Sequence, residues 1–92
     1  QGKAMMVEMT LPVGSPYAGS RVGDVPFPGN TVLTGIIRGG HPIAPSRDDA
    51  LEPLDELLFV TTPDVEAELE SLLSPGQRHK RDTDNADDDE DA

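Results

Sequence analysis

Two adjacent glycines between apolar segments constrain the fold of this chain more than any other feature. Gly39-Gly40 follows a segment rich in β-branched residues, 31–38, and precedes a shorter apolar segment, 41–45. A two-residue glycine turn between such segments is typical of a tight β-hairpin. Because Pro42 and Pro45 lack backbone donors, the second strand is expected at a sheet edge.

Two more segments are predicted to form strands. In 5–11 the apolar residues alternate with polar ones, which predicts a half-buried strand with Met5, Val7, Met9 and Leu11 on one face. Residues 56–62 are almost continuously apolar, so we expect a strand that is buried on both faces.

Two segments are predicted to begin helices with a hydroxyl residue followed by proline. Ser15-Pro16 begins a short helix that extends toward residue 25, and Thr62-Pro63 begins a longer one. The second helix has one apolar stripe, made of Val65, Leu69, Leu72 and Leu73. The order of elements predicts an α+β fold: a small, mostly antiparallel sheet with two helices.

The composition excludes several classes of function. The chain has 92 residues, enough for one domain with a modest core. It has no cysteine, which argues against a disulfide-stapled secreted fold and against a thiolate zinc site. A net charge of −11 and an aromatic content of 3% disfavour nucleic-acid binding, which needs basic surfaces and stacking rings.

The chain divides into a domain over 1–76 and a tail over 77–92. The tail has alanine as its one apolar residue type and many acids, which predicts a disordered acidic extension; the alternative is an interaction tail. No apolar segment approaches the roughly 18 residues of a transmembrane helix. We therefore expect no direct membrane insertion and a cytoplasmic location.

No group of residues indicates catalysis or metal binding. Ser15 has no partner in the sequence typical of an activated nucleophile, and its place before a proline fits an N-cap. The acids between positions 48 and 56 match no calcium-loop spacing, which favours a solvated acidic turn. We expect a protein that is not an enzyme and that holds no metal and no cofactor.

Four segments occur in a distinctive order along the chain. They are LPVGSP at 11–16 with Gly19, VLTGIIRGGHPIAP at 32–45, LEPLDELLFV at 51–60 and TPDV at 62–65. This succession resembles the TrkA-C domain family, also called RCK-C, over roughly residues 6 to 74. The family usually has Gly-Asp before its closing strand, whereas this chain has Leu54-Asp55. If that turn needs a positive φ, Leu54 is strained.

The resemblance implies a regulatory domain of cytoplasmic subunits that gate potassium channels, potassium uptake systems and some cation/proton antiporters. Such domains follow a nucleotide-binding Rossmann domain and dimerise, and in some members the dimer cleft binds cyclic di-AMP. The expected partners are a second copy and a membrane channel or transporter subunit, with the protein peripheral to that transporter. Because this chain has no Gly-x-Gly-x-x-Gly segment, NAD or ATP would bind elsewhere.

The resemblance also indicates candidate ligand residues in the hairpin, which would cradle the bases and hold the phosphates. Arg38 is the sharpest candidate because an arginine can bind a phosphate with two hydrogen bonds. The full candidate set is Ile36, Ile37, Arg38, His41, Pro42 and Ile43. In the alternative interpretation, Arg38 points into water, the isoleucines belong to the core or a dimer interface, and His41 is a turn residue.

Two other arginines have two interpretations each. Arg21 and Arg47 are able to reach an anion across a dimer cleft, or they are ordinary surface residues beside Asp24, Asp48 and Asp49.

The same features allow other functions. The first alternative is a purely structural dimerisation domain, with all sensing done by a separate nucleotide-binding domain. The second is an unrelated small adaptor that binds a protein through its edge strand.

Overall fold

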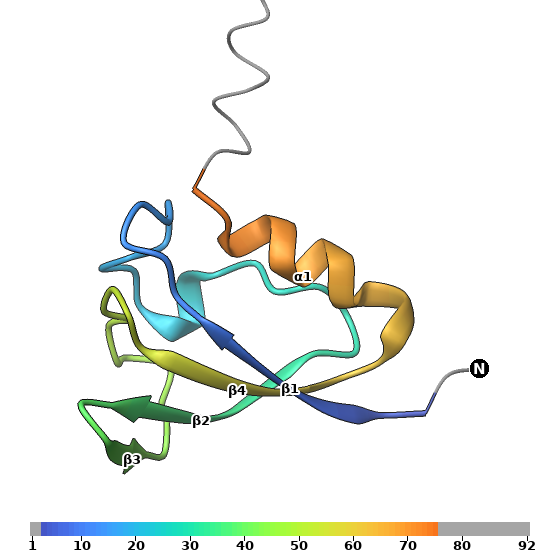
Figure 1. Ribbon diagram of the computed structural model, residues 1–92, viewed down its shortest axis with the longest axis horizontal. Coiled ribbons are helices and arrows are strands. Elements are labelled where there is room, and N and C mark those ends of the chain that lie inside the picture. Colours follow the sequence, from blue (N-terminus) through green and yellow to red (C-terminus); the bar gives the residue numbers. More distant parts are fainter. Residues whose placement is uncertain (1–2, 76–92) are drawn as a thin grey trace, which may run out of the picture.

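Within residues 3–75, an antiparallel sheet in the order β1-β4-β2-β3 organises the fold (Figure 1). The computed structural model of the protein describes these residues, so the predicted tail over 77–92 lies outside the described part. The strands are β1 (Met5–Thr10), β2 (Val32–Arg38), β3 (His41–Ile43) and β4 (Glu56–Thr61). The predicted α+β class and antiparallel sheet are confirmed.

The predicted hairpin joins β2 to β3 at one side of the sheet. Gly39 and Gly40 have φ angles of 58° and 82°. Two successive positive φ angles define a type I′ turn, whose twist matches that of the flanking strands. As predicted, β3 is an edge strand, although it ends at Ile43 rather than at Pro45.

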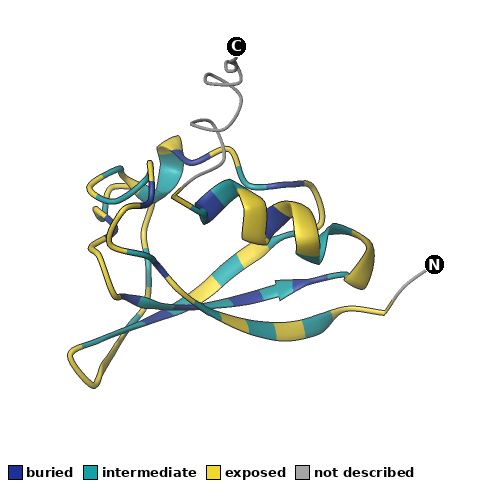
Figure 2. Ribbon diagram, turned by 45° about the horizontal axis from the view of Figure 1, so that its top comes forward, coloured by how far each residue is buried: buried dark blue, intermediate teal, exposed yellow. Residues whose placement is uncertain are grey.

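Strand β4 lies between β1 and β2 and supplies the centre of the core. Leu57, Phe59 and Thr61 on one face are fully buried, while the alternating residues Leu58 and Val60 are half-buried (Figure 2). The prediction of burial on both faces is therefore correct for one face. That face is covered by helix α1 and the loops, and the other face is open in the single chain.

Helix α1 (Glu66–Leu73) covers the buried face of the sheet after a 3-10 turn, η2 (Pro63–Val65). Leu69 and Leu73 from the predicted apolar stripe are buried. Pro63 begins the helical segment as predicted, but the Thr62 hydroxyl makes no capping bond. It is buried without a hydrogen-bond partner among the described residues.

The predicted first helix is wrong. Residues 15–25 form a single turn followed by a 3-10 helix, η1 (Val22–Asp24), so residues 3–75 contain one α-helix rather than two. Gly19 has a φ of 90°, which ends the turn, and the Ser15 hydroxyl accepts a bond from the Tyr17 N–H at 3.2 Å. A left-handed residue cannot continue a right-handed helix, and this explains the interruption.

Side chains from the strands, α1 and the loops form one core. Phe59 at its centre contacts Phe27 edge-on, with ring centroids 5.5 Å apart. The fully or nearly fully buried apolar residues are Leu11, Val25, Ile36, Leu51, Leu57, Phe59, Leu69 and Leu73. In the part of the chain that the structure describes, no helix has the length and apolar character to cross a bilayer.

Candidate ligand groove

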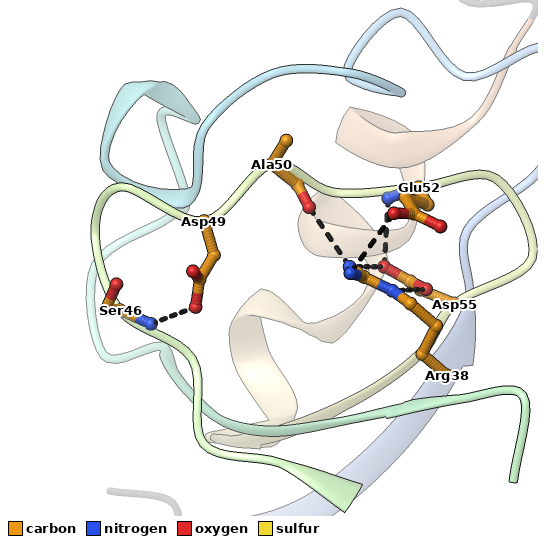
Figure 3. Close-up of polar contacts among 6 residues, drawn as sticks. All are labelled: Arg38, Ser46, Asp49, Ala50, Glu52 and Asp55. Carbon is orange, nitrogen blue, oxygen red and sulfur yellow. Dashed lines mark hydrogen bonds and ion pairs between the residues drawn. The ribbon is translucent and has the colours of Figure 1, made fainter. Parts of the chain in front are cut away.

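Arg38 ends β2 and binds the loop that leads into β4 (Figure 3). Its Nε donates to Asp55 Oδ1 at 2.8 Å and its Nη2 donates to Asp55 Oδ2 at 2.7 Å. This is a bidentate arginine–carboxylate pair, a geometry stronger and more specific than a single ionic contact. Arg38 thereby ties the hairpin to the 46–55 loop.

The rest of the Arg38 guanidinium is also occupied. Nη2 donates to the Ala50 carbonyl at 3.0 Å, and Nη1 lies 3.2 Å from Glu52 Oε2. Asp55 is 2% exposed and also accepts a bond from the Glu52 N–H at 2.9 Å. Burial acts to raise the pKa of Asp55, but the bonds from Arg38 and from the Glu52 amide outweigh it and lower that pKa.

The other predicted ligand residues do not share one surface. Ile36 is 1% exposed and belongs to the core, whereas its neighbour Ile37 is half-buried on the opposite, open face. Successive residues of a strand point to opposite faces, so these two cannot cradle one base together. On β3, His41 and Pro42 are exposed and Ile43 packs partly against the core.

A groove of about 350 Å³ lies nearby, between η1, the start of β2 and the segment that follows β3. None of the six predicted ligand residues lines it. Its walls present polar and apolar surface in about equal amounts and include one cationic side chain. The lining residues are Val22, Gly23, Val25, Phe27, Thr31, Val32, Leu33, Pro45, Ser46 and Arg47.

Arg47 supplies the positive charge of this groove. Its backbone carbonyl accepts a bond from the Gly23 N–H at 2.9 Å, which fixes the two segments side by side. Its side chain folds over Gly23, where a Cβ atom would lie 3.0 Å from the Arg47 Cζ and Nη2 atoms. Within residues 3–75 the ion pairs are those of Arg38, so no described carboxylate lies within 4.0 Å of the Arg47 guanidinium.

A second hollow of similar size, about 360 Å³, lies between β1 and α1 and has the opposite charge. Glu8 and Glu70 line it, together with Leu73 and Ser74. Hydrogen bonding and repulsion between Glu8 and Glu56 raise the pKa of Glu56, as expected for carboxylates held close together. An anionic ligand would be repelled here, so the groove beside Arg47 is the better candidate.

Sequence reasoning missed most of the groove for an identifiable reason. Its walls come from segments 22–27, 31–33 and 45–47, which only the tertiary fold brings together. The one available signal was Arg47, a basic residue in an acidic chain. The sequence leaves it open whether the neighbouring acids pair with Arg47. Asp49 instead accepts a bond from the Ser46 N–H at 2.8 Å.

The fold and the succession of segments agree with a known family. The TrkA-C domain family matches residues 6–74, most of the chain. The chain belongs to the TrkA-C domain family. This TrkA-C chain is 43% identical over 74 residues to the Trk system potassium uptake protein TrkA of two Mycobacterium tuberculosis strains, CDC 1551 / Oshkosh and H37Rv. The match covers 80% of this chain and 34% of each relative, so the chain spans about a third of their length.

Solved structures share the fold. A structure described as an RCK domain with cda matches with a TM-score of 0.68 and 25% identity, covering 75% of this chain and 97% of the other. The RCK_C domain dimer of S. agalactiae BusR in complex with c-di-AMP matches with a TM-score of 0.66 and 21% identity. The match covers 74% of this chain and 93% of the other. The GsuK RCK domain matches with a TM-score of 0.68 and 24% identity, and the match covers 79% of this chain and 16% of the other.

Proposed function

We propose that this TrkA-C domain is a non-catalytic regulatory module that binds a cyclic dinucleotide, with cyclic di-AMP as the leading candidate. In this proposal it acts as a homodimer on the cytoplasmic side of a membrane potassium channel or transporter. The observation that carries the proposal is a groove with apolar side chains and one arginine, in a fold shared with a BusR dimer described in complex with c-di-AMP.

The chemistry of the groove supports this class of ligand. A cyclic dinucleotide has two planar bases, which prefer apolar and aromatic surroundings, and two phosphates, which prefer arginine. Val25, Phe27 and Pro45 offer the apolar surface, and Arg47 offers the charge. The groove of one chain has one arginine in its lining, whereas the ligand has two equivalent halves.

Two copies of the chain around a twofold axis would match a twofold-symmetric ligand. In a closed dimer the same surface patch occurs on both subunits. Each groove would then hold one base and one phosphate of a shared ligand, with one ligand for two chains. For regulation, the ligand must also favour one arrangement of the two copies over another, because equal affinity for both would shift no equilibrium.

The direct test is calorimetric titration of the full chain with cyclic di-AMP, with the linear dinucleotide as control. Saturable binding with one ligand per two chains, and weaker binding of the linear compound, supports the proposal. A titration without heat at millimolar ligand, together with no displacement of a fluorescent cyclic di-AMP derivative, would remove the sensor function.

A structural dimerisation domain is the second candidate. The open face of the sheet favours it, because Met6 and Val32 there are 64% and 59% exposed and Val60 lies between them. An apolar sheet face is a common basis of self-association. Sedimentation that shows a stable dimer without ligand, together with a silent titration, would establish this function instead.

A further inference from the structure

We propose that the basic segment 78–81 of this chain, with the sequence RHKR, lies along the outer edge of β1, antiparallel to that strand, and covers it. The segment belongs to the part of the sequence outside the described residues. The interaction goes beyond the proposed function, because β1 and the hairpin strand β3 are at opposite edges of the sheet and no nucleotide takes part.

The outer edge of β1 presents backbone groups that no described strand pairs. Within residues 3–75, β1 is the first strand of the sheet and has β4 as its neighbour. The Leu11 N–H donates to the Asp55 carbonyl at 2.8 Å, at the end of the β1–β4 pairing. Hydrogen-bonding residues alternate along an antiparallel pair, so Met6, Glu8 and Thr10 direct their N–H and C=O groups away from β4.

This edge lacks the usual protection against further strands. Natural sheets protect an edge with proline, lysine, a bulge or a covering segment. The sequence of β1, MMVEMT, contains neither proline nor lysine, and its register with β4 has no shift. In contrast, β3 at the other edge has three residues, one of which is Pro42. The edge of β1 is therefore the better place for an added extended segment.

The surface beside this edge is acidic. Glu8 on β1 and Glu70 on α1 are exposed and line the hollow of about 360 Å³ between the two elements. The ion pairs within residues 3–75 are those of Arg38, so no described lysine or arginine lies within 4.0 Å of either carboxylate. On the neighbouring strand, hydrogen bonding and repulsion from Glu8 raise the pKa of Glu56. Carboxylates crowded in this way favour a cationic partner.

The described chain ends next to this acidic edge. Ser74, directly after α1, lines the same hollow as Glu8. A Cβ atom on Gly14 would lie 3.1 Å from the Pro75 Cβ atom, so Pro75 lies against the segment that follows β1. Pro75 is the last described residue, and the sequence continues from this end of β1.

The continuing sequence supplies the complementary charge. Segment 78–81 contains three of the seven lysines and arginines of the chain. An extended chain spans at most about 3.6 Å per residue, so Lys80 is able to lie roughly 17 Å from Pro75. Glu8 is two residues, roughly 7 Å, from Thr10 along β1. The basic segment therefore reaches Glu8 without a long connection.

The alternation of side chains places a basic residue on each face of the added strand. In an extended segment Arg78 and Lys80 share one face, and Arg81 lies on the other. The edge of β1 offers an acid to both faces, because Glu8 is on the open face of the sheet and Glu70 is on the helix that covers the other face. Opposite charges on neighbouring strands stabilise their pairing.

The test measures where a spin label placed after the basic segment lies. The chain has no cysteine, so Thr83→Cys provides a single attachment site for a nitroxide in the full chain. At low salt, we expect the label to broaden the amide signals of Met6 and Glu8 more than those of His41 and Ile43. The difference should decrease at about 0.5 M salt, because exposed ion pairs are then screened.

Two variants of equal net charge show whether the basic side chains are responsible. Arg78→Gln/Lys80→Gln should reduce the broadening at β1 and accelerate hydrogen exchange of its outward-directed amides by roughly three- to tenfold. Arg21→Glu also lowers the net charge by two, but at an exposed residue outside β1 and α1, and should leave both readouts unchanged.

An exchange of charges tests the predicted pairing directly. Glu8→Lys alone and Lys80→Glu alone should each reduce the broadening at β1. The chain with both substitutions should regain it, because the opposite charges are restored.

Two results would overturn the proposal. The first is broadening at β1 that is no stronger than at β3, or that is unchanged in Arg78→Gln/Lys80→Gln. The second comes from mixing isotope-labelled chains without the nitroxide with spin-labelled chains without isotopes. Broadening at β1 as strong in this mixture would show that the basic segment of another copy occupies the edge. Its absence, with broadening in the singly labelled chain, supports docking within one chain.

Discussion

Leu54 occupies a backbone conformation that leucine rarely adopts. Its φ is 73°, in the left-handed region, and its side chain is 64% exposed. The left-handed conformation costs a residue with a Cβ atom about 1–2 kcal/mol of conformational free energy, and glycine has no such cost. We predict that Leu54→Gly raises the free energy of unfolding by about 1 kcal/mol, after allowance for glycine's greater freedom in the unfolded chain. Urea denaturation measures the change.

Leu54→Ala is the matched control. It removes the same exposed side chain but keeps the Cβ atom, so it should leave stability near that of the wild type. Equal stabilisation by alanine and by glycine would show that the exposed apolar side chain, rather than the backbone conformation, is responsible.

Arg38 and Arg47 provide a second comparison at the scale of single residues. Arg38→Met leaves Asp55, which is 2% exposed, without its partner, and we predict a loss of about 2 kcal/mol. This figure is below the range for a fully buried pair because the Arg38 side chain is 31% exposed. Arg47→Met should change stability by less than about 0.5 kcal/mol. Thermal and urea unfolding of both variants would contradict this account if the two losses were similar.

The Arg38–Asp55 pair also makes the free energy of unfolding depend on pH in a direction that can be predicted. Because the pKa of Asp55 is lowered in the folded protein, the unfolded chain binds a proton at a pH where the folded chain does not. The stabilisation is present above the ordinary carboxyl pKa, about 3.9, and is lost as the pH falls through the folded value. In Asp55→Asn this acid-dependent loss should be absent. Identical slopes of stability against pH below about 4 in both proteins would contradict the prediction.

At the scale of elements, the hairpin depends on its two glycines. Gly40 has a φ of 82°, and alanine there would be strained although no neighbouring atom lies within 4 Å. We predict that Gly40→Ala costs about 1 kcal/mol and weakens amide protection in β3. Gly29→Ala is the control, because Gly29 is equally uncrowded and has no positive φ. Equal losses in hydrogen exchange at β3 for both variants would rule out the turn as the cause.

Elements were predictable from the sequence where local chemistry decides them. The hairpin follows from Gly39-Gly40 and its apolar flanks, and α1 follows from a stripe with a 3.6-residue period. The segment 15–25 also has helical spacing, but Gly19 at a φ of 90° interrupts it. Whether a glycine adopts a left-handed conformation depends on its tertiary contacts. Gly19 donates to the Leu51 carbonyl at 2.7 Å, a contact 32 positions distant that no local pattern reveals.

The site was less predictable than the fold. Arg38 in the structure is the partner of a buried carboxylate, and its role as a ligand residue stays a prediction. Its partner, Asp55, stands in the segment where the sequence shows only a run of acids. A list of charges does not reveal which of several acids a given arginine binds, since the answer depends on which side chains the fold buries. The groove beside Arg47 depends in the same way on three segments that meet only in the folded chain.

At the scale of the whole molecule, the Arg38–Asp55 pair and the groove use different side chains but share the 46–55 loop, which supplies Ser46 and Arg47 to the groove. The Arg38–Asp55 pair holds the hairpin to the loop before β4, while the groove lies between η1 and the segment after β3. The open sheet face includes Met6 and adjoins the groove at Val32, which also lines the groove.

In the proposed function, the nucleotide binds in the groove beside Arg47 rather than at the hairpin. The most direct measurement is a map of backbone amide shifts in the isotope-labelled full chain as cyclic di-AMP is added. We predict that the largest changes occur at Val22, Gly23 and Arg47, with small changes at His41 and Ile43. Changes centred on Arg38, His41 and Ile43, or no changes at millimolar ligand, would contradict the account.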